Sequence, residues 1–168
     1  MTEGDKRRGY LEEILVQLPG FKGYLARENR RDSDQACREH LAARLTAAKK
    51  AVGEAKRRML SAGKLLGIER LDRVSDRLEK VVSKVSHAER GYTGFFDRNQ
   101  IGPEELDRLH EADLALTEYA LAIEQKLSGL PKAAPGDEMD AAVEAALEAV
   151  ERFETVFDQR KRVMTEVS

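Results

Sequence analysis

The sequence predicts an all-α protein, an antiparallel four-helix bundle with a long first helix. Apolar residues recur at alternating spacings of three and four in four segments, and charged residues make up 36% of the chain. These patterns are typical of amphipathic helices with wide solvated faces, and no segment shows the alternation of a strand. The 168 residues fit one bundle domain over 18–168, preceded by a loose segment over 1–17 with a short helix.

The first long helix is predicted from Tyr24 to Ser61. This range holds no proline and one glycine, and it follows a Leu-Pro-Gly triplet at 18–20 that stops the preceding turn. At the α-helical rise it would be about 57 Å long, so we expect one end to project or bend back. We call the stripe of apolar residues at spacings of three and four along a helix its seam. In the second half of this helix the seam is Leu41, Leu45, Ala48, Val52, Ala55 and Met59.

Three further helices are predicted over 68–88, 103–127 and 137–166. Gly91 suits a C′ position, Pro103 the first helical position and Asp137 an N-cap. Residues 128–137 contain two prolines and two glycines and are predicted to be a linker. The seams are Leu71, Val74, Leu78, Val81, Val85 and Ala88, then Leu106, Leu109, Asp113, Leu116, Ala120, Ile123 and Leu127, then Met139, Val143, Leu147, Val150, Phe153 or Glu154, Phe157 and Met164.

Opposite charges are concentrated at the two ends of the sequence. Residues 1–64 contain 15 Lys+Arg against 9 Asp+Glu, whereas residues 103–168 contain 7 against 16. We expect the basic first third to pair with the acidic last third inside the bundle. Basic surface left unpaired would instead suit nucleic acid or an anionic membrane.

A row of charges replaces the apolar seam in the first half of the first helix. Extending the seam backward from Leu41 gives Arg38, Asp34, Arg31, Arg27 and Tyr24. The row is either a solvated helix arm or an ionic docking surface for a partner. A catalytic cluster fits the pattern less well, because no His or Ser nucleophile has a matching spacing.

Asp113 occupies a seam position of the third helix, between Leu109 and Leu116. A buried carboxylate needs a partner or a shifted pKa. We therefore expect either a half-exposed Asp that fixes the helix register or a carboxylate bonded to a Tyr or Arg. The expected partners are Arg31, Arg38, Tyr92 and the backbone amides of residues 91–98.

Two segments rich in glycine and aromatic residues adjoin the predicted helices, at 18–24 and 91–97. The second carries Tyr92, Phe95 and Phe96, whose rings either cap the bundle or form an exposed patch for a protein partner. In an antiparallel bundle both segments lie at the same end. They are expected to converge there with the charged row and Asp113.

Residues 18–34 (LPGFKGYLARENRRDSD) and 87–97 (HAERGYTGFFD), with EADLALTEY following, resemble paired segments of a group of uncharacterised bacterial all-helical proteins. The resemblance covers about residues 18–125. It implies a bundle with a specific end region and a bacterial source. It carries over no activity and no catalytic residue.

Several classes of protein do not fit the sequence. Cys37 is the only cysteine, which rules out a disulfide scaffold and favours a reducing, cytoplasmic compartment. No signal peptide and no apolar run of the ~18 residues needed to span a membrane is recognised. The sequence lacks Glu-x-x-His pairs, phosphate-binding glycine loops and a nucleophile elbow, so we expect no enzyme, cofactor or metal.

The function predicted from the sequence is a non-enzymatic interaction or scaffold module. Its partner would be a protein of unknown identity or a second copy of the chain, docked at the charged and aromatic end. The residues expected to contact it are Tyr24, Arg27, Arg31, Asp34, Tyr92, Phe95, Phe96 and Asp113. The alternatives are a bundle that binds a metal or small ligand with Asp113 and His110 or His87, and a basic-face binder of anionic membrane or, less favoured, nucleic acid.

Overall fold

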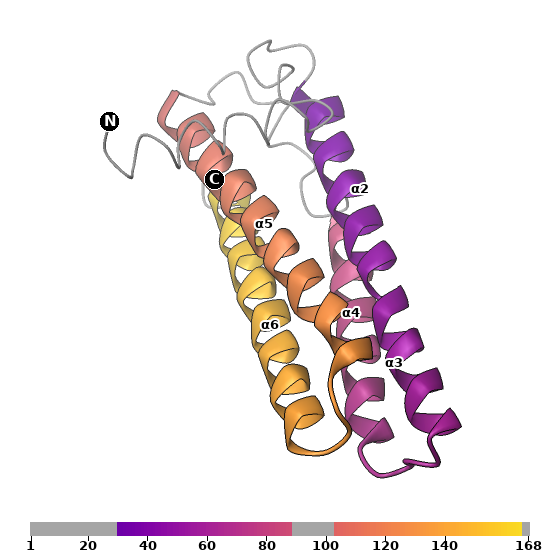
Figure 1. Cartoon of the computed structure of the whole chain (residues 1–168). Helices are drawn as coiled ribbons and strands as arrows, with labels where there is room; N and C mark the ends of the chain where they lie inside the picture. The colour runs from indigo at the N-terminus through magenta and orange to yellow at the C-terminus, as the bar shows by residue number, and fades with distance from the viewer. Residues whose placement is uncertain (1–29, 89–102, 166–168) are drawn as a thin grey trace, which may run out of the picture.

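The computed structural model of the chain describes residues 30–88 and 103–165, and these residues form helices and no strand. The elements are α2 (Arg30–Ala48), α3 (Lys50–Ser61), α4 (Ile68–Ser86), α5 (Pro103–Gly129), the 3₁₀ helix η4 (Leu130–Lys132) and α6 (Asp137–Thr165). Helices α2 and α3 together form one long first helix (Figure 1). The predicted all-α four-helix bundle with a long first helix is confirmed.

The first helix passes through a small irregularity at Lys49. Lys49 keeps right-handed helical dihedral angles, and its amide bonds the Leu45 carbonyl at 3.1 Å, so the helix direction continues from α2 into α3. The predicted start at Tyr24 lies outside the described residues. So does the short helix predicted within residues 1–17.

The four helices form a ring in which α2 and α6 occupy opposite corners. Helix α2 packs against α4 and α5, and α6 packs against the same two helices. Helices that follow one another in the sequence run in opposite directions, as predicted. Helices that are neighbours in space include both antiparallel and parallel pairs. The pairs α2–α4 and α5–α6 are antiparallel, whereas α2–α5 and α4–α6 are parallel (Figure 1).

Ion pairs between the basic and acidic parts of the chain connect the two parallel pairs of helices. Arg44 on α2 donates two hydrogen bonds of 2.7 Å to Glu124 on α5. Lys84 on α4 bonds both Glu154 and Asp158 on α6. The predicted pairing of the basic first part with the acidic last part is therefore confirmed where α2 meets α5, and basic residues of α4 extend it to α6.

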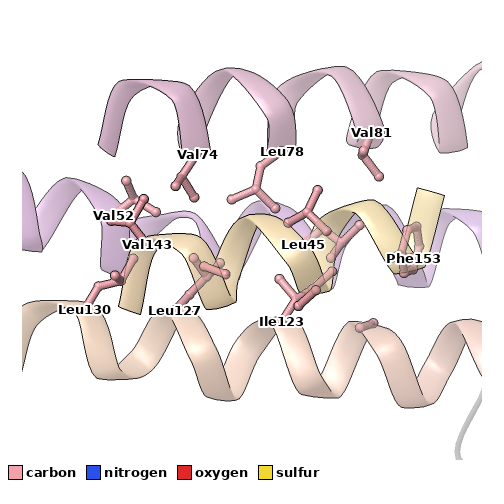
Figure 2. Packing of buried hydrophobic residues seen from close by; sticks show 14 of the residues in the cluster. Leu45, Val52, Val74, Leu78, Val81, Ile123, Leu127, Leu130, Val143 and Phe153 are labelled. Atoms are coloured by element: carbon pink, nitrogen blue, oxygen red, sulfur yellow. The ribbon is translucent and has the colours of Figure 1, made fainter. Parts of the chain in front are cut away.

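One continuous apolar core fills the space between the helices (Figure 2). Leu45, Leu78, Ile123 and Phe153 come from four different helices and are each fully buried. Burial of such side chains is the main favourable contribution to folding. The predicted seams are confirmed at nearly all described positions, but in α6 the buried residue is Ala146, whereas Leu147 is only partly buried.

The connection between α5 and α6 is more ordered than the predicted linker. Helix α5 continues to Gly129, and the following turn η4 places Leu130 in the core at 0% exposure. This turn packs against α3. The end of the first helix, α3, is therefore covered partly by η4. The sequence composition indicated only a loop here, whereas this single 3₁₀ turn buries an apolar side chain.

Candidate functional site

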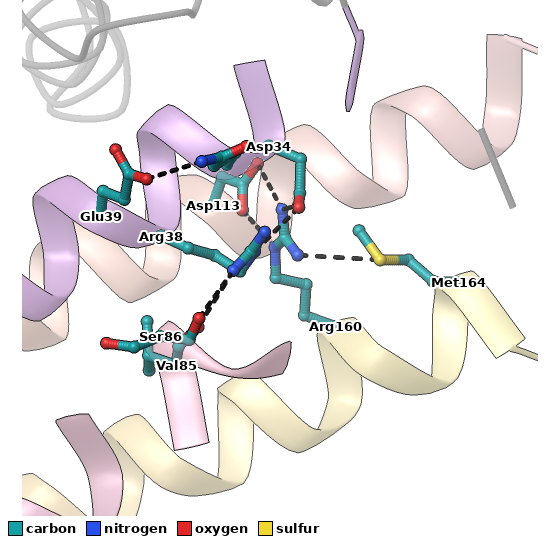
Figure 3. A network of polar contacts seen from close by, with 9 residues as sticks. Asp34, Arg38, Glu39, Val85, Ser86, Asp113, Arg160 and Met164 are labelled. Carbon is teal, nitrogen blue, oxygen red and sulfur yellow. Dashed lines mark hydrogen bonds and ion pairs between the residues drawn. The ribbon is translucent and has the colours of Figure 1, made fainter. Parts of the chain in front are cut away.

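Four charged side chains are buried together at one end of the bundle. Asp34 and Arg38 on α2, Asp113 on α5 and Arg160 on α6 are each between 1% and 3% exposed. We call these four residues the ionic network, and the end where they lie the ionic end (Figure 3). Two acids and two bases balance in formal charge, as buried charges require.

Arg160 is the centre of the ionic network. Its Nε lies 2.5 Å from Oδ1 of Asp113, and its Nη2 lies 2.6 Å from Oδ1 of Asp34. The third nitrogen, Nη1, lies 3.7 Å from the sulfur of Met164 one turn further along α6. The planar guanidinium therefore serves two carboxylates at fixed angles, which a lysine ammonium would not reproduce.

Arg38 extends the ionic network to the fourth helix. Its Nε donates to Oδ2 of Asp34 at 2.8 Å, one turn away on α2. Its Nη1 points at the carbonyl oxygens of Val85 and Ser86, at 3.4 and 3.3 Å. These carbonyls end α4, where a cation complements the partial negative charge of the helix terminus. All four helices are thus joined at the ionic end.

We expect the ionic network to specify packing more than it adds net stability. Removing charges from water costs free energy that their mutual attraction recovers only when the geometry is good. Here the two carboxylates share one guanidinium, and Asp113 reaches it from a seam position that Leu109 and Leu116 flank in sequence. A helix shifted along its axis would leave a charge unpaired, so the network favours one register.

Cys37 is buried beside the ionic network, at 3% exposure. Burial raises the pKa of its thiol far above the usual value, and the negative charge of Asp113 raises it further. The thiol therefore stays protonated at neutral pH. A protonated, buried thiol is a small apolar side chain and a poor nucleophile.

The structure corrects the expected environment of the charged row. Asp34 and Arg38 are not part of a solvated helix arm but lie inside the bundle. The partner of Asp113 is Arg160, which the sequence prediction did not include. Asp34 and Asp113 were expected to contact a partner protein directly, yet both carboxylates are buried and paired within the chain. Both carboxylates instead link their helices to α6 through Arg160.

The remaining predicted contact residues lie outside what the structure describes. Tyr24, Arg27, Tyr92, Phe95 and Phe96 belong to residues 1–29 and 89–102. Arg31 is in the first turn of α2, but its side chain is outside the described set. The described helix termini nevertheless place the attachment points of both segments at the ionic end (Figure 1).

Arg160 is the residue that the sequence analysis missed. It follows Phe157 and precedes Met164 in the alternating spacing of the α6 seam, as Asp113 does in α5. The available signal was a pair of opposite charges at seam positions of two helices, Arg160 in α6 and Asp113 in α5. Reading the two seams together would have suggested the ion pair.

The described part of the chain does not place the histidines of the alternative metal site in a cluster of possible metal ligands. Nδ1 of His87 lies 2.8 Å from the carbonyl oxygen of Ser83 on its own helix. The carboxylate of Asp113 is bound to Arg160. Within residues 30–88 and 103–165, no three His, Cys, Asp or Glu side chains are placed to hold a metal ion.

The fold and the site define a four-helix bundle with a buried ionic network at one end. Comparison with known proteins returns no match to a family model, a curated protein or a solved structure. None of the helices in the described part of the chain is long and apolar enough to cross a membrane.

Proposed function

We propose that the chain is a non-enzymatic interaction or scaffold module that binds a protein partner at its ionic end. The observation that supports this is the position of Arg160, which ties α2, α5 and α6 together where residues 1–29 and 89–102 join the bundle. A fixed arrangement of helix ends reduces the entropy lost when the adjoining segments bind a partner.

The proposal assigns different roles to the buried and the adjoining residues. Asp34 and Asp113 position the helix ends and do not touch the partner. Tyr24, Arg27, Arg31, Tyr92, Phe95 and Phe96 are the proposed contact residues, all carried by or next to the two adjoining segments. Aromatic and arginine side chains contribute most of the binding free energy in many interfaces.

A cytoplasmic location is part of the proposal. Cys37 is the only cysteine in the sequence, so no disulfide can form within the chain, which suits a reducing compartment. The partner is either another protein or a second copy of this chain. The mass of a crosslinked product distinguishes the two.

The test is site-specific photo-crosslinking in cells. A photoreactive phenylalanine analogue replaces Phe96, and the control carries it in place of Arg152, which is exposed on α6. A defined product from position 96 and not from 152 is expected. Products that are the same from both positions, or no product from position 96, would contradict the proposal.

Binding by the purified partner completes the test. Phe96→Ala and Arg31→Ala are expected to weaken binding, whereas Arg152→Ala is expected to leave it unchanged. Arg160→Lys keeps the charge but loses the planar fork, so it should weaken binding if the network positions the contact segments. Circular dichroism of each variant separates lost binding from lost folding.

A further inference from the structure

The exposed large hydrophobic side chains of the described chain are all at the end opposite the ionic network. Leu60, Leu65 and Leu66 are 53%, 69% and 94% exposed. Leu60 is in the last turn of α3, and the other two lie in the turn between α3 and α4. We call residues 56–67 the hairpin tip; Figure 1 shows it at the far end of the bundle.

The bundle does not need these leucines for its own core. Met59, Leu71 and Leu130 already fill the core at this end and are at most 2% exposed. Burying Leu65 and Leu66 would require the turn to fold back over side chains that are already covered. The three leucines are therefore exposed apolar side chains that the described chain leaves uncovered.

The hairpin tip is an ordered turn that holds the leucines outward. Gly63 and Gly67 have φ angles of +68° and +95°, which other residues rarely adopt. The amide of Lys64 bonds the Met59 carbonyl at 2.9 Å and closes the end of α3. The exposed leucines are therefore carried by an ordered turn at the end of the bundle.

The same twelve residues carry positive charge and no carboxylate: Lys56, Arg57, Arg58 and Lys64 lie in the hairpin tip, and Asp and Glu do not occur between 56 and 67. Lys56 pairs with Asp72 on α4, and Arg58 donates to the Pro131 carbonyl. Arg57 and Lys64 pair with no carboxylate of the described chain. Both are exposed beside the leucines and free to meet an anionic surface.

We propose that the hairpin tip docks on an anionic lipid bilayer. Protruding leucines enter the interface between headgroups and acyl chains, which needs no complementary groove in a partner. Arg57 and Lys64 then lie at the level of the lipid phosphates, where basic residues are attracted to anionic lipids. This site is separate from the proposed protein-binding ionic end, so each can fail without the other.

A tryptophan reporter measures insertion directly. The natural chain contains no Trp, so Leu66→Trp gives a single fluorophore at the most exposed position of the tip. Its emission should shift to the blue with vesicles of equimolar phosphatidylcholine and phosphatidylglycerol, and much less with phosphatidylcholine alone. Glu148→Trp, at an exposed site on α6, is the control and should not shift.

Vesicle co-sedimentation of the full chain then separates the two contributions. Leu65→Ser with Leu66→Ser should weaken binding to the anionic vesicles by at least about tenfold. Arg57→Glu with Lys64→Glu should weaken it by at least about tenfold and remove its salt dependence. Lys80→Glu with Arg108→Glu makes the same change in net charge at exposed sites away from the tip and should preserve binding.

Three outcomes would overturn the proposal. The first is that the natural chain does not bind the anionic vesicles. The second is that the leucine pair can be replaced without weakening the binding. The third is that the chain does not bind vesicles but forms an oligomer, and that replacing the leucines dissociates this oligomer. The tip would then be a contact between copies of this chain.

Discussion

Arg160 on α6 binds Asp34 on α2 at 2.6 Å, although these two helices occupy opposite corners of the bundle. The arginine side chain crosses the interior and meets Asp113 of α5 on the way. Figure 3 shows the two carboxylates converging on the one guanidinium. A single side chain therefore connects three helices, and most of the expected behaviour of the ionic end depends on it.

Replacing Arg160 by methionine should strongly destabilise the bundle. Arg160→Met keeps a long side chain but leaves Asp34 and Asp113 buried without their cation. Breaking a buried ion pair from one side costs about 3–5 kcal/mol of unfolding free energy. Urea unfolding followed by circular dichroism measures the change.

The control for that measurement is Arg152→Met on the same helix. Arg152 pairs with Glu148 one turn away, and both side chains are 63% exposed. Exposed pairs of this kind contribute about 0–1 kcal/mol. Equal small losses in both variants would show that the ionic network does not have the role assigned to it.

Replacing the whole ionic network by apolar residues should recover most of the lost stability. The variant combines Asp34→Leu, Arg38→Met, Asp113→Leu and Arg160→Met, so that no charge is left buried alone. Such replacements are often neutral or stabilising, and we expect an unfolding free energy within about 2 kcal/mol of the natural chain. A variant no more stable than Arg160→Met would contradict this account, and broadened amide signals in its NMR spectrum would indicate lost specificity of packing.

The thiol of Cys37 should react very slowly in the folded protein. Burial and the nearby Asp113 charge raise its pKa, so little thiolate forms and reagents cannot reach it. Ellman's reagent is expected to titrate one thiol per chain in urea and almost none without it. Arg160→Met should speed the native reaction because it weakens the end that covers Cys37. Native and unfolded rates that are alike would contradict the burial of this residue.

His40 should make stability depend on pH in mildly acidic solution. Burial lowers the pKa of its imidazole below 6.5, and Arg44 lowers it further, while Glu124 opposes the shift. The unfolded chain binds the proton more tightly than the folded chain. The free energy of unfolding is therefore unaffected by His40 above pH 6.5, and it decreases as the pH falls from 6.5 toward the pKa of His40 in the folded chain. His40→Gln should remove this dependence in urea titrations across that range. An NMR titration of the imidazole that gave a raised pKa would reverse the expected sign.

The helices could be predicted from the sequence because their signals are local. The helix predicted over 68–88 is α4, which runs from Ile68 to Ser86, and Pro103 begins α5 as its position-specific preference indicated. The seams were readable because residues three and four apart lie on one helix face. The buried turn at Leu130 was not predicted, because its burial depends on α3 and not on its neighbours in sequence.

Three of the four residues of the ionic network could also be recognised in the sequence. Asp113 and the row containing Asp34 and Arg38 stood out as charges at apolar seam positions. Their partner could not be chosen from one helix at a time, because several arginines were available. Whether the row faced water or the interior depended on where α6 lies, and local sequence does not specify that.

For residues 30–88 and 103–165, the sequence by itself determined the four long helices, most of their described boundaries and the face of each that is buried, since these follow from spacing and helix-end residues. Only the tertiary structure decided the ring order, the parallel neighbours α2–α5 and α4–α6, and the union of Asp34, Asp113 and Arg160. The physical reason is that a buried charge pairs with whichever opposite charge the packed helices bring close to it, wherever that charge lies in the sequence. Arg160 lies far from Asp34 along the chain, and only the packed bundle brings them together.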